Sequence, residues 1–147
     1  MFRSHPMMTV RKMLLPFALL GFSGEAMARG WSADWKLIGV AEDRTEVLVR
    51  PESVRELPPS ADRRFTVRQV WAGFDQTGAS GIDAGRKIVL FQYDCASQRM
   101  LIAAATDFTA DGKVIARNAV PSDRADLYEK VEPATLGATI MATACPA

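Results

Sequence analysis

Two cysteines placed after an export-type segment constrain this fold more than any other feature of the chain. Cys95 and Cys145 are the two cysteines of the 147-residue sequence. Both follow a segment with the pattern of a removable signal peptide, and an exported chain enters an oxidising compartment. Two thiols within one small domain normally form a disulfide there. We therefore expect a Cys95–Cys145 bond, and we exclude both cysteines as nucleophiles.

The export signal is expected at residues 1–28. Arg11-Lys12 forms a short basic region, residues 13–22 form an apolar run, and Ala26-Met27-Ala28 supplies the small residues that a signal peptidase reads. The apolar run is shorter than the roughly 20 residues that a membrane span needs. Cleavage is expected before Arg29, with Met7 or Met8 as the initiator, so that no membrane span remains after cleavage.

Residues 29–147 are expected to form one domain of common size, which can bury about two thirds of its unfolded surface. Cleavage removes His5, the one histidine of the chain, together with three basic residues and one acidic residue. The remaining domain then has 15 basic and 16 acidic residues and is close to neutral. A nucleic-acid-binding domain usually has a strongly basic stripe. The composition therefore excludes nucleic acid as the expected partner.

Alternating hydrophobicity predicts a sheet through most of the domain. In the segment from Lys87 to Asp94, Val89, Phe91 and Tyr93 share one face and Ile88 and Leu90 share the other, as is typical of a central strand. Pro51 is expected to end one strand, and the Asp111-Gly112 dipeptide is expected to form a hairpin turn. The predicted strands cover residues 35–40, 45–50, 63–74, 87–94, 100–108 and 113–118.

The C-terminal segment changes to a helical period. Leu136, Ile140 and Ala144 recur at helical spacing, and Thr135 is the expected N-cap. So short a helix would not persist alone, and we expect the disulfide to keep it docked on the sheet. The sequence thus predicts an α+β fold: a single antiparallel sheet of about six strands, with a C-terminal helix packed on one face and tied by a disulfide.

The order of several motifs resembles that of the surface-adhesin protein E family. The resemblance covers residues 31–145, and the order and spacing of the motifs carry it. The motifs are Trp35 at a strand start, Val-Leu-Val-Arg-Pro-Glu-Ser-Val at 47–54, Arg-Gln-Val-Trp at 68–71, Tyr-Asp-Cys at 93–95, Arg-Met-Leu-Ile at 99–102 and a terminal helix ending in Cys145. The family has an antiparallel sheet with a disulfide-tethered C-terminal helix, which agrees with the fold predicted above.

The resemblance also implies a function. The family takes its name from bacterial surface proteins that bind host extracellular-matrix and plasma proteins. This chain departs from it at Arg50, where family members commonly have an aspartate before the Pro-x-Ser-Val turn. We expect the turn to be kept with its capping changed. Any function of that aspartate is in doubt here.

No catalytic, cofactor-binding or metal-binding residues are predicted, and the domain is not expected to be an enzyme. Residues 107–112 lack the alternating oxygen ligands of a calcium loop and indicate a hairpin. The glycine-rich segment 73–85 lacks a phosphate-binding fingerprint and a following helix. The serines of the cleaved domain have no histidine to activate them.

The candidate partner-binding face is basic. Arg64, Arg68 and Arg50, with Arg63 and Arg55 nearby, can form a patch for an acidic partner, although their alternation also fits a solvated sheet face. Core packing is the expected role of Trp35 and Trp71. The role of Trp31 stays open between core packing and an exposed interface anchor.

Two function classes follow from these observations. The first is an exported, non-enzymatic binding or adhesion module for a protein partner such as an extracellular-matrix or other envelope protein. The alternative is a periplasmic, envelope-associated or small-ligand-binding domain. Both place the domain in the periplasm or at the cell surface. The exposed edge strands of an open sheet can pair between chains, which leaves a homodimer open.

Overall fold

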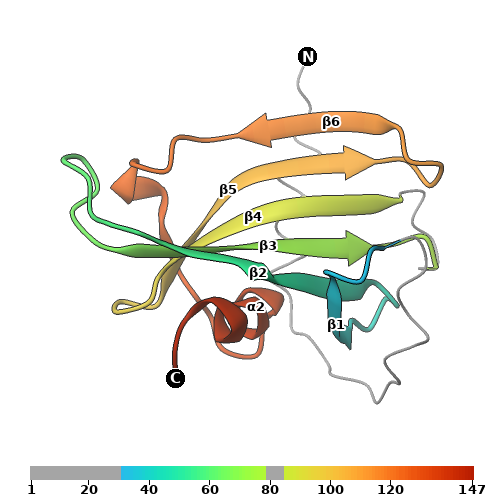
Figure 1. Ribbon diagram of the computed structural model, residues 1–147, viewed down its shortest axis with the longest axis horizontal. Helices are drawn as coiled ribbons and strands as arrows, with labels where there is room; N and C mark the ends of the chain where they lie inside the picture. Colours follow the sequence, from blue (N-terminus) through green and yellow to red (C-terminus); the bar gives the residue numbers. More distant parts are fainter. Residues whose placement is uncertain (1–30, 79–84) are drawn as a thin grey trace.

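The computed structural model describes residues 31–78 and 85–147, so the predicted signal segment lies outside the described residues (Figure 1). In chain order the elements are β1 (Lys36–Val40), β2 (Glu46–Leu57), β3 (Val67–Asp75), β4 (Arg86–Asp94), β5 (Arg99–Phe108), β6 (Val114–Ala119), the 3-10 helix η2 (Ala125–Leu127), β7 (Glu129–Lys130) and α2 (Leu136–Ala144).

The strands form one open antiparallel sheet in the order β1-β2-β3-β4-β5-β6. From β1 to β6 each strand pairs with the next along the chain, so this part of the sheet is a meander. The two-residue strand β7, which the sequence did not predict, pairs with the start of β5 through Arg99↔Lys130 and Met100↔Glu129. The predicted fold class is confirmed: a single antiparallel sheet with a C-terminal helix packed on it and a disulfide.

The main core lies between the sheet and α2, on a side that we call the helix face. Alternate residues of the central strands point to it, as strand geometry requires. From α2, Leu136, Ile140 and Ala144 pack against them. The buried strand residues of this core are Val47, Val49, Val70, Ala72, Phe74, Val89, Phe91, Tyr93, Met100 and Ala105.

The opposite side of the sheet, which we call the outer face, has two smaller apolar clusters. In one, Trp31 and Trp35 pack over Leu37 and Leu48. In the other, Val67, Leu101 and Ala103 are packed with Tyr128, Phe65 and neighbouring leucines. Central strands with apolar residues on both faces are therefore covered on both sides, in agreement with the pattern predicted for residues 87–94.

Pro51 does not end a strand, contrary to the sequence-based prediction. Strand β2 continues to Leu57, and its ladder with β3 is interrupted between Arg50 and Arg55. Ser53 fills the gap: its hydroxyl donates to the carbonyl of Arg50 at 2.6 Å and accepts from the amide of Trp71 at 2.9 Å. A side chain thus supplies the hydrogen bond that the backbone ladder lacks here, and the strand survives the proline.

The segment before β3 also differs from the prediction, because the strand begins at Val67 and not at residue 63. Arg63 is buried, and its guanidinium donates to the carbonyls of Pro58 at 2.6 Å and Phe65 at 3.1 Å. These bonds hold residues 58–65 as a closed loop, because a buried guanidinium must find partners for its donors.

Helix α2 begins as predicted and ends at Ala144, one residue before the predicted end at Cys145. Thr135 is the N-cap, and its hydroxyl accepts from the amide of Ala138 at 3.3 Å. Cys145 is the C-cap residue, with its amide bonded to the carbonyl of Met141. In the described part of the chain, no helix has the length and apolar character that crossing a membrane requires.

Candidate functional site

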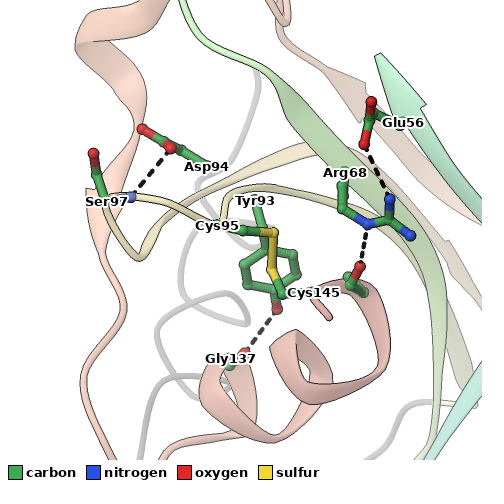
Figure 2. The surroundings of a disulfide bond; sticks show 9 residues. Glu56, Arg68, Tyr93, Asp94, Cys95, Ser97, Gly137 and Cys145 are labelled. Atoms are coloured by element: carbon green, nitrogen blue, oxygen red, sulfur yellow. Dashed lines mark hydrogen bonds and ion pairs between the residues drawn. A yellow bond between two sulfur atoms is a disulfide. The ribbon is translucent and has the colours of Figure 1, made fainter. Parts of the chain in front are cut away.

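A disulfide ties the C-terminal end of α2 to the end of β4 (Figure 2). Cys95 directly follows β4, Cys145 directly follows α2, and their Cα atoms are 5.8 Å apart. The predicted Cys95–Cys145 bond is therefore confirmed. In Figure 2 the hydroxyl of Tyr93 points to α2, where it donates to the carbonyl of Gly137 at 2.7 Å. Burial raises the pKa of Tyr93 well above its ordinary value, so the phenol stays a donor.

A third link from the sheet to α2 comes from Arg68 of β3. Its Nε donates to the carbonyl of Ala144 at 2.7 Å, and its Nη1 pairs with Glu56 at 3.2 Å (Figure 2). The last carbonyls of a helix have no partner within the helix and form the negative end of its dipole, so a cation is favoured there. Arg68 thus has a structural role at the helix end, whatever else it binds.

The structure does not bring the three predicted partner-binding arginines onto one face. Arg50 pairs in register with Trp71 and lies on the outer face, where it forms an ion pair with Asp34 at 3.4 Å. Arg68 lies on the helix face. Arg64 is exposed in the loop before β3. Of the three arginines, only Arg64 therefore remains as a candidate for the basic binding surface, and its role stays a prediction.

On the outer face, the Trp31 side chain makes both polar and apolar contacts. Its indole Nε1 donates to Oδ2 of Asp75 at 2.9 Å, and Arg86 lies over its ring at 5.2 Å from the centroid. The ring covers Gly73, where a Cβ atom would approach it to 2.5 Å. Trp31 also meets Trp35 edge to face, with ring centroids 4.9 Å apart. Trp31 is thus packed against the sheet and hydrogen-bonded to it.

The buried carboxylate of Asp75 is held in its charged form. Burial on its own would raise its pKa, but hydrogen bonds from Thr77 and Trp31 and the charge of Arg86 outweigh burial and lower the pKa below the ordinary 3.8. Thr77 contributes both its amide, at 3.0 Å, and its hydroxyl, at 2.6 Å. All these contacts are between residues of the domain itself, so the role of the cluster is structural: it holds Trp31 against the sheet.

A second buried ion pair joins Lys87 of β4 to Asp107 of β5 on the helix face. The Lys87 side chain is almost completely buried, and burial lowers its pKa from 10.5 to about 8. Cross-strand opposite charges stabilise an antiparallel pair. Among residues 31–78 and 85–147, no group of three or more His, Cys, Asp and Glu side chains is arranged to hold a metal ion.

Apart from the two-residue β7, strand β6 is the most exposed strand of the sheet. Of the described residues, the exposed large apolar ones all lie on β6 or directly after it: Val114, Ile115 and Val120, with exposed fractions of 47, 57 and 39%. Within the described part of the chain β6 pairs with β5 alone. In Figure 1 it forms the edge of the sheet farthest from α2. Among the described residues, this edge therefore combines exposed large apolar side chains with the unpaired side of an edge strand.

A comparison with protein-family models decides the family. The model described as surface-adhesin protein E matches residues 35–146, which is about three quarters of the chain. The chain belongs to the surface-adhesin protein E family. No curated protein and no solved structure matches it significantly. Membership places this domain among exported, adhesion-type proteins, and the disulfide is consistent with that location.

In this protein E domain, Arg50 stands where the resemblance led us to expect an aspartate. Its side chain pairs with Asp34, and its carbonyl accepts the Ser53 hydroxyl in the interrupted part of β2. The expected turn is thus an irregularity within one long strand. An arginine is accommodated because its side chain is exposed to solvent, where it also pairs with Asp34 from the segment that precedes β1.

Sequence reasoning missed the β6 edge as a candidate surface. It predicted a strand at residues 113–118 but assigned it no role. A signal was present, because Val114 and Ile115 are adjacent, and adjacent residues of a regular strand point to opposite faces. The six β6 residues, read as a last strand before a polar segment, indicate an edge with one side unpaired.

Proposed function

We propose that this protein E domain is a non-enzymatic adhesion module that acts at the cell surface and binds a protein of the host extracellular matrix or plasma. The single observation that carries the proposal is the family match over residues 35–146. The exposed apolar residues of β6 support it, because an exposed apolar patch on a small domain commonly marks an interaction site.

The location is tested by fractionating cells that produce the full chain with a C-terminal tag. Display at the surface predicts that added protease removes the tagged domain from intact cells. A periplasmic control protein must stay intact in the same sample. If the domain is found in the periplasm alone and is protected from protease, the adhesion proposal is wrong and a periplasmic role replaces it.

Binding is tested with purified residues 29–147 in a solid-phase assay against immobilised vitronectin, laminin and heparin. We expect saturable binding to at least one of the two proteins. Arg64→Ala is expected to weaken that binding if the exposed arginine contributes. Lys130→Ala, which removes an exposed charge on β7, is the matched control. If Arg64→Ala binds as well as the parent domain, Arg64 is not part of the site.

Arg68→Ala needs a separate control because Arg68 also supports the end of α2. Its melting temperature must be measured with its binding. Loss of binding with an unchanged melting temperature would assign Arg68 to the partner surface. Equal binding would remove it from that surface and leave the structural role alone.

A further inference from the structure

The free edge of β6, on the side away from β5, presents backbone N–H and C=O groups. Another β-strand could form a regular ladder of hydrogen bonds with them. The amide of Val120 donates to the carbonyl of Ala103 of β5 at 2.9 Å. Successive peptide groups of a strand point to alternate sides within the sheet plane. Asn118 therefore also bonds toward β5, and the N–H and C=O groups of Arg117 and Ala119 point away from it. Within residues 31–78 and 85–147 no strand pairs with this side of β6, which leaves a row of backbone donors and acceptors at strand spacing.

The exposed side chains of β6 favour a partner segment that is itself partly apolar, because two large apolar residues, Val114 and Ile115, are uncovered there. In register with β5, Val114 and Arg117 stand on the outer face, while Ala116 and Asn118 stand on the helix face. Ile115 falls in the irregular part of the ladder and is the most exposed of the apolar side chains.

The charge of the β6 edge indicates which charge the partner segment should have. Residues 112–122 contain Lys113 and Arg117 and no acidic residue. Lysines and prolines usually protect an edge strand from pairing. Here Lys113 precedes the strand and Pro121 follows it, so they limit the open window to its six residues instead of blocking its middle.

We propose that β6 captures an extended segment of a partner protein by strand addition, and that the segment is about six residues long, rich in β-branched residues and acidic at one position facing Arg117. Backbone hydrogen bonds supply the general affinity and alternate side chains supply the selectivity, as in other strand-addition complexes. This inference rests on the proposed function and names the chemistry of its partner.

The test uses a defined probe and residues 29–147 as purified protein. The probe is an acetylated, amidated hexapeptide of alternating valine and threonine with one central glutamate. The key variant is Ala119→Pro, which removes the outward N–H and keeps the amides that bond to β5; edge positions tolerate proline where the N–H faces solvent. Ala119→Ser is the matched control because it keeps the N–H.

We expect the peptide to bind the parent domain and Ala119→Ser alike, and to bind Ala119→Pro about tenfold more weakly, as the loss of one net hydrogen bond implies. Amide exchange followed by NMR should show new protection at Arg117 and Ala119, with little change at Asn118. If Ala119→Pro binds like the parent, or if the parent binds no peptide, the proposal is wrong.

Charge reversal keeps the proposal testable if Ala119→Pro fails to fold. Arg117→Glu is expected to weaken binding of the glutamate peptide and to strengthen binding of the same peptide with lysine in place of glutamate. Equal binding of both peptides by both proteins would overturn the assigned acidic position. If sedimentation shows a dimer that Arg117→Glu or Ala119→Pro converts to monomer, the occupant is a second copy and the partner proposal fails.

The outcome separates this inference from the adhesion proposal. If vitronectin or laminin binds Ala119→Pro as well as the parent domain, adhesion stands and β6 is not its site. If the peptide responds to the variants as expected while neither matrix protein binds, strand addition stands and the proposed class of host partner is wrong.

Discussion

At the scale of single residues, Gly73 makes the docking of Trp31 possible. A Cβ atom at this position would lie 2.5 and 2.6 Å from two carbons of the indole ring. These distances are too short for non-bonded carbons, so an alanine must displace the ring and its bond to Asp75. The glycine is thus required by a close approach of a side chain and not by its own backbone angle.

We predict that Gly73→Ala displaces Trp31 and destabilises the domain by about 1–3 kcal/mol, the usual cost of overpacking. Urea unfolding measures the free energy, and the tryptophan emission of the folded state should shift to longer wavelength as the ring becomes solvated. Gly78→Ala is the control, since its Cβ would meet no atom within 4 Å. Equal stability of the two variants would show that Trp31 is not docked at Gly73 in solution.

The pH dependence of stability should report Asp75. Its pKa in the folded state is lowered, so its contribution is present above the ordinary value of 3.8 and is lost as pH falls through the folded pKa. Asp75→Asn should be less stable than the parent at neutral pH, by about 1–3 kcal/mol for the lost charged hydrogen bonds.

The difference between the parent and Asp75→Asn should shrink as pH falls from about 5 toward about 2, because only the parent must then protonate this carboxylate. Urea unfolding across this range measures it. Asp62→Asn, which alters an exposed carboxylate, is the control. A difference that stays constant down to the lowest pH would contradict a lowered pKa for Asp75.

At the scale of elements, the disulfide acts with Tyr93 and Arg68 to hold a nine-residue helix that has little stability of its own. The bond closes a loop with a sequence separation of 50. For a loop of that size, the chain-entropy estimate of its stabilisation is about 4 kcal/mol. This is a large part of the total stability of a small domain, about 5–15 kcal/mol.

We predict that the double variant Cys95→Ala, Cys145→Ala loses about 2–4 kcal/mol of unfolding free energy in urea. Dithiothreitol should destabilise the parent domain by a similar amount and leave the double variant unchanged, which controls for other effects of the reductant. A loss near zero would mean that the carbonyl bonds from Tyr93 and Arg68 already hold α2 in place.

The sequence predicted the elements well because their signals are local. Alternation in residues 87–94 and the helical spacing of Leu136, Ile140 and Ala144 each need only neighbouring residues. What failed was the end of the second strand, which was expected at Pro51 but lies at Leu57. Arg50 and Arg55 are five residues apart and would lie on opposite faces of a regular strand, yet the interrupted ladder pairs them with Trp71 and Gln69, which share a face.

The sequence gives only a partial signal for the candidate surface, and the reason is related. Arg68 and Arg63 looked like members of a basic patch because a sequence does not show which carbonyls lie within reach. In the structure, Arg68 donates a hydrogen bond to the end of α2, and Arg63 donates hydrogen bonds to carbonyls of the 58–65 loop. Conversely, the exposure of Val114 and Ile115 depends on β6 being the last strand of the sheet, which is a property of the whole topology.

At the scale of the whole molecule, stability and location are linked through the single disulfide. A domain of this family in a reducing compartment would lack the bond between β4 and α2, and a larger fraction of its molecules would be unfolded. Export therefore does more than place the domain where a partner can meet it. The oxidising compartment completes the fold, and the sheet edge that we propose as the binding surface lies at the side of the sheet away from α2 (Figure 1).

We predict that the full chain, produced in a bacterium with an oxidising periplasm, is cleaved before Arg29 and contains Cys95 bonded to Cys145. Intact mass and non-reducing peptide mapping of the purified protein check both points. The same domain produced without residues 1–28 in a reducing cytoplasm should carry two free thiols and melt at a lower temperature. Oxidising that protein in vitro should restore the melting temperature of the exported form. Free thiols in the exported protein, or equal melting of the reduced and oxidised forms, would contradict the link between location and stability.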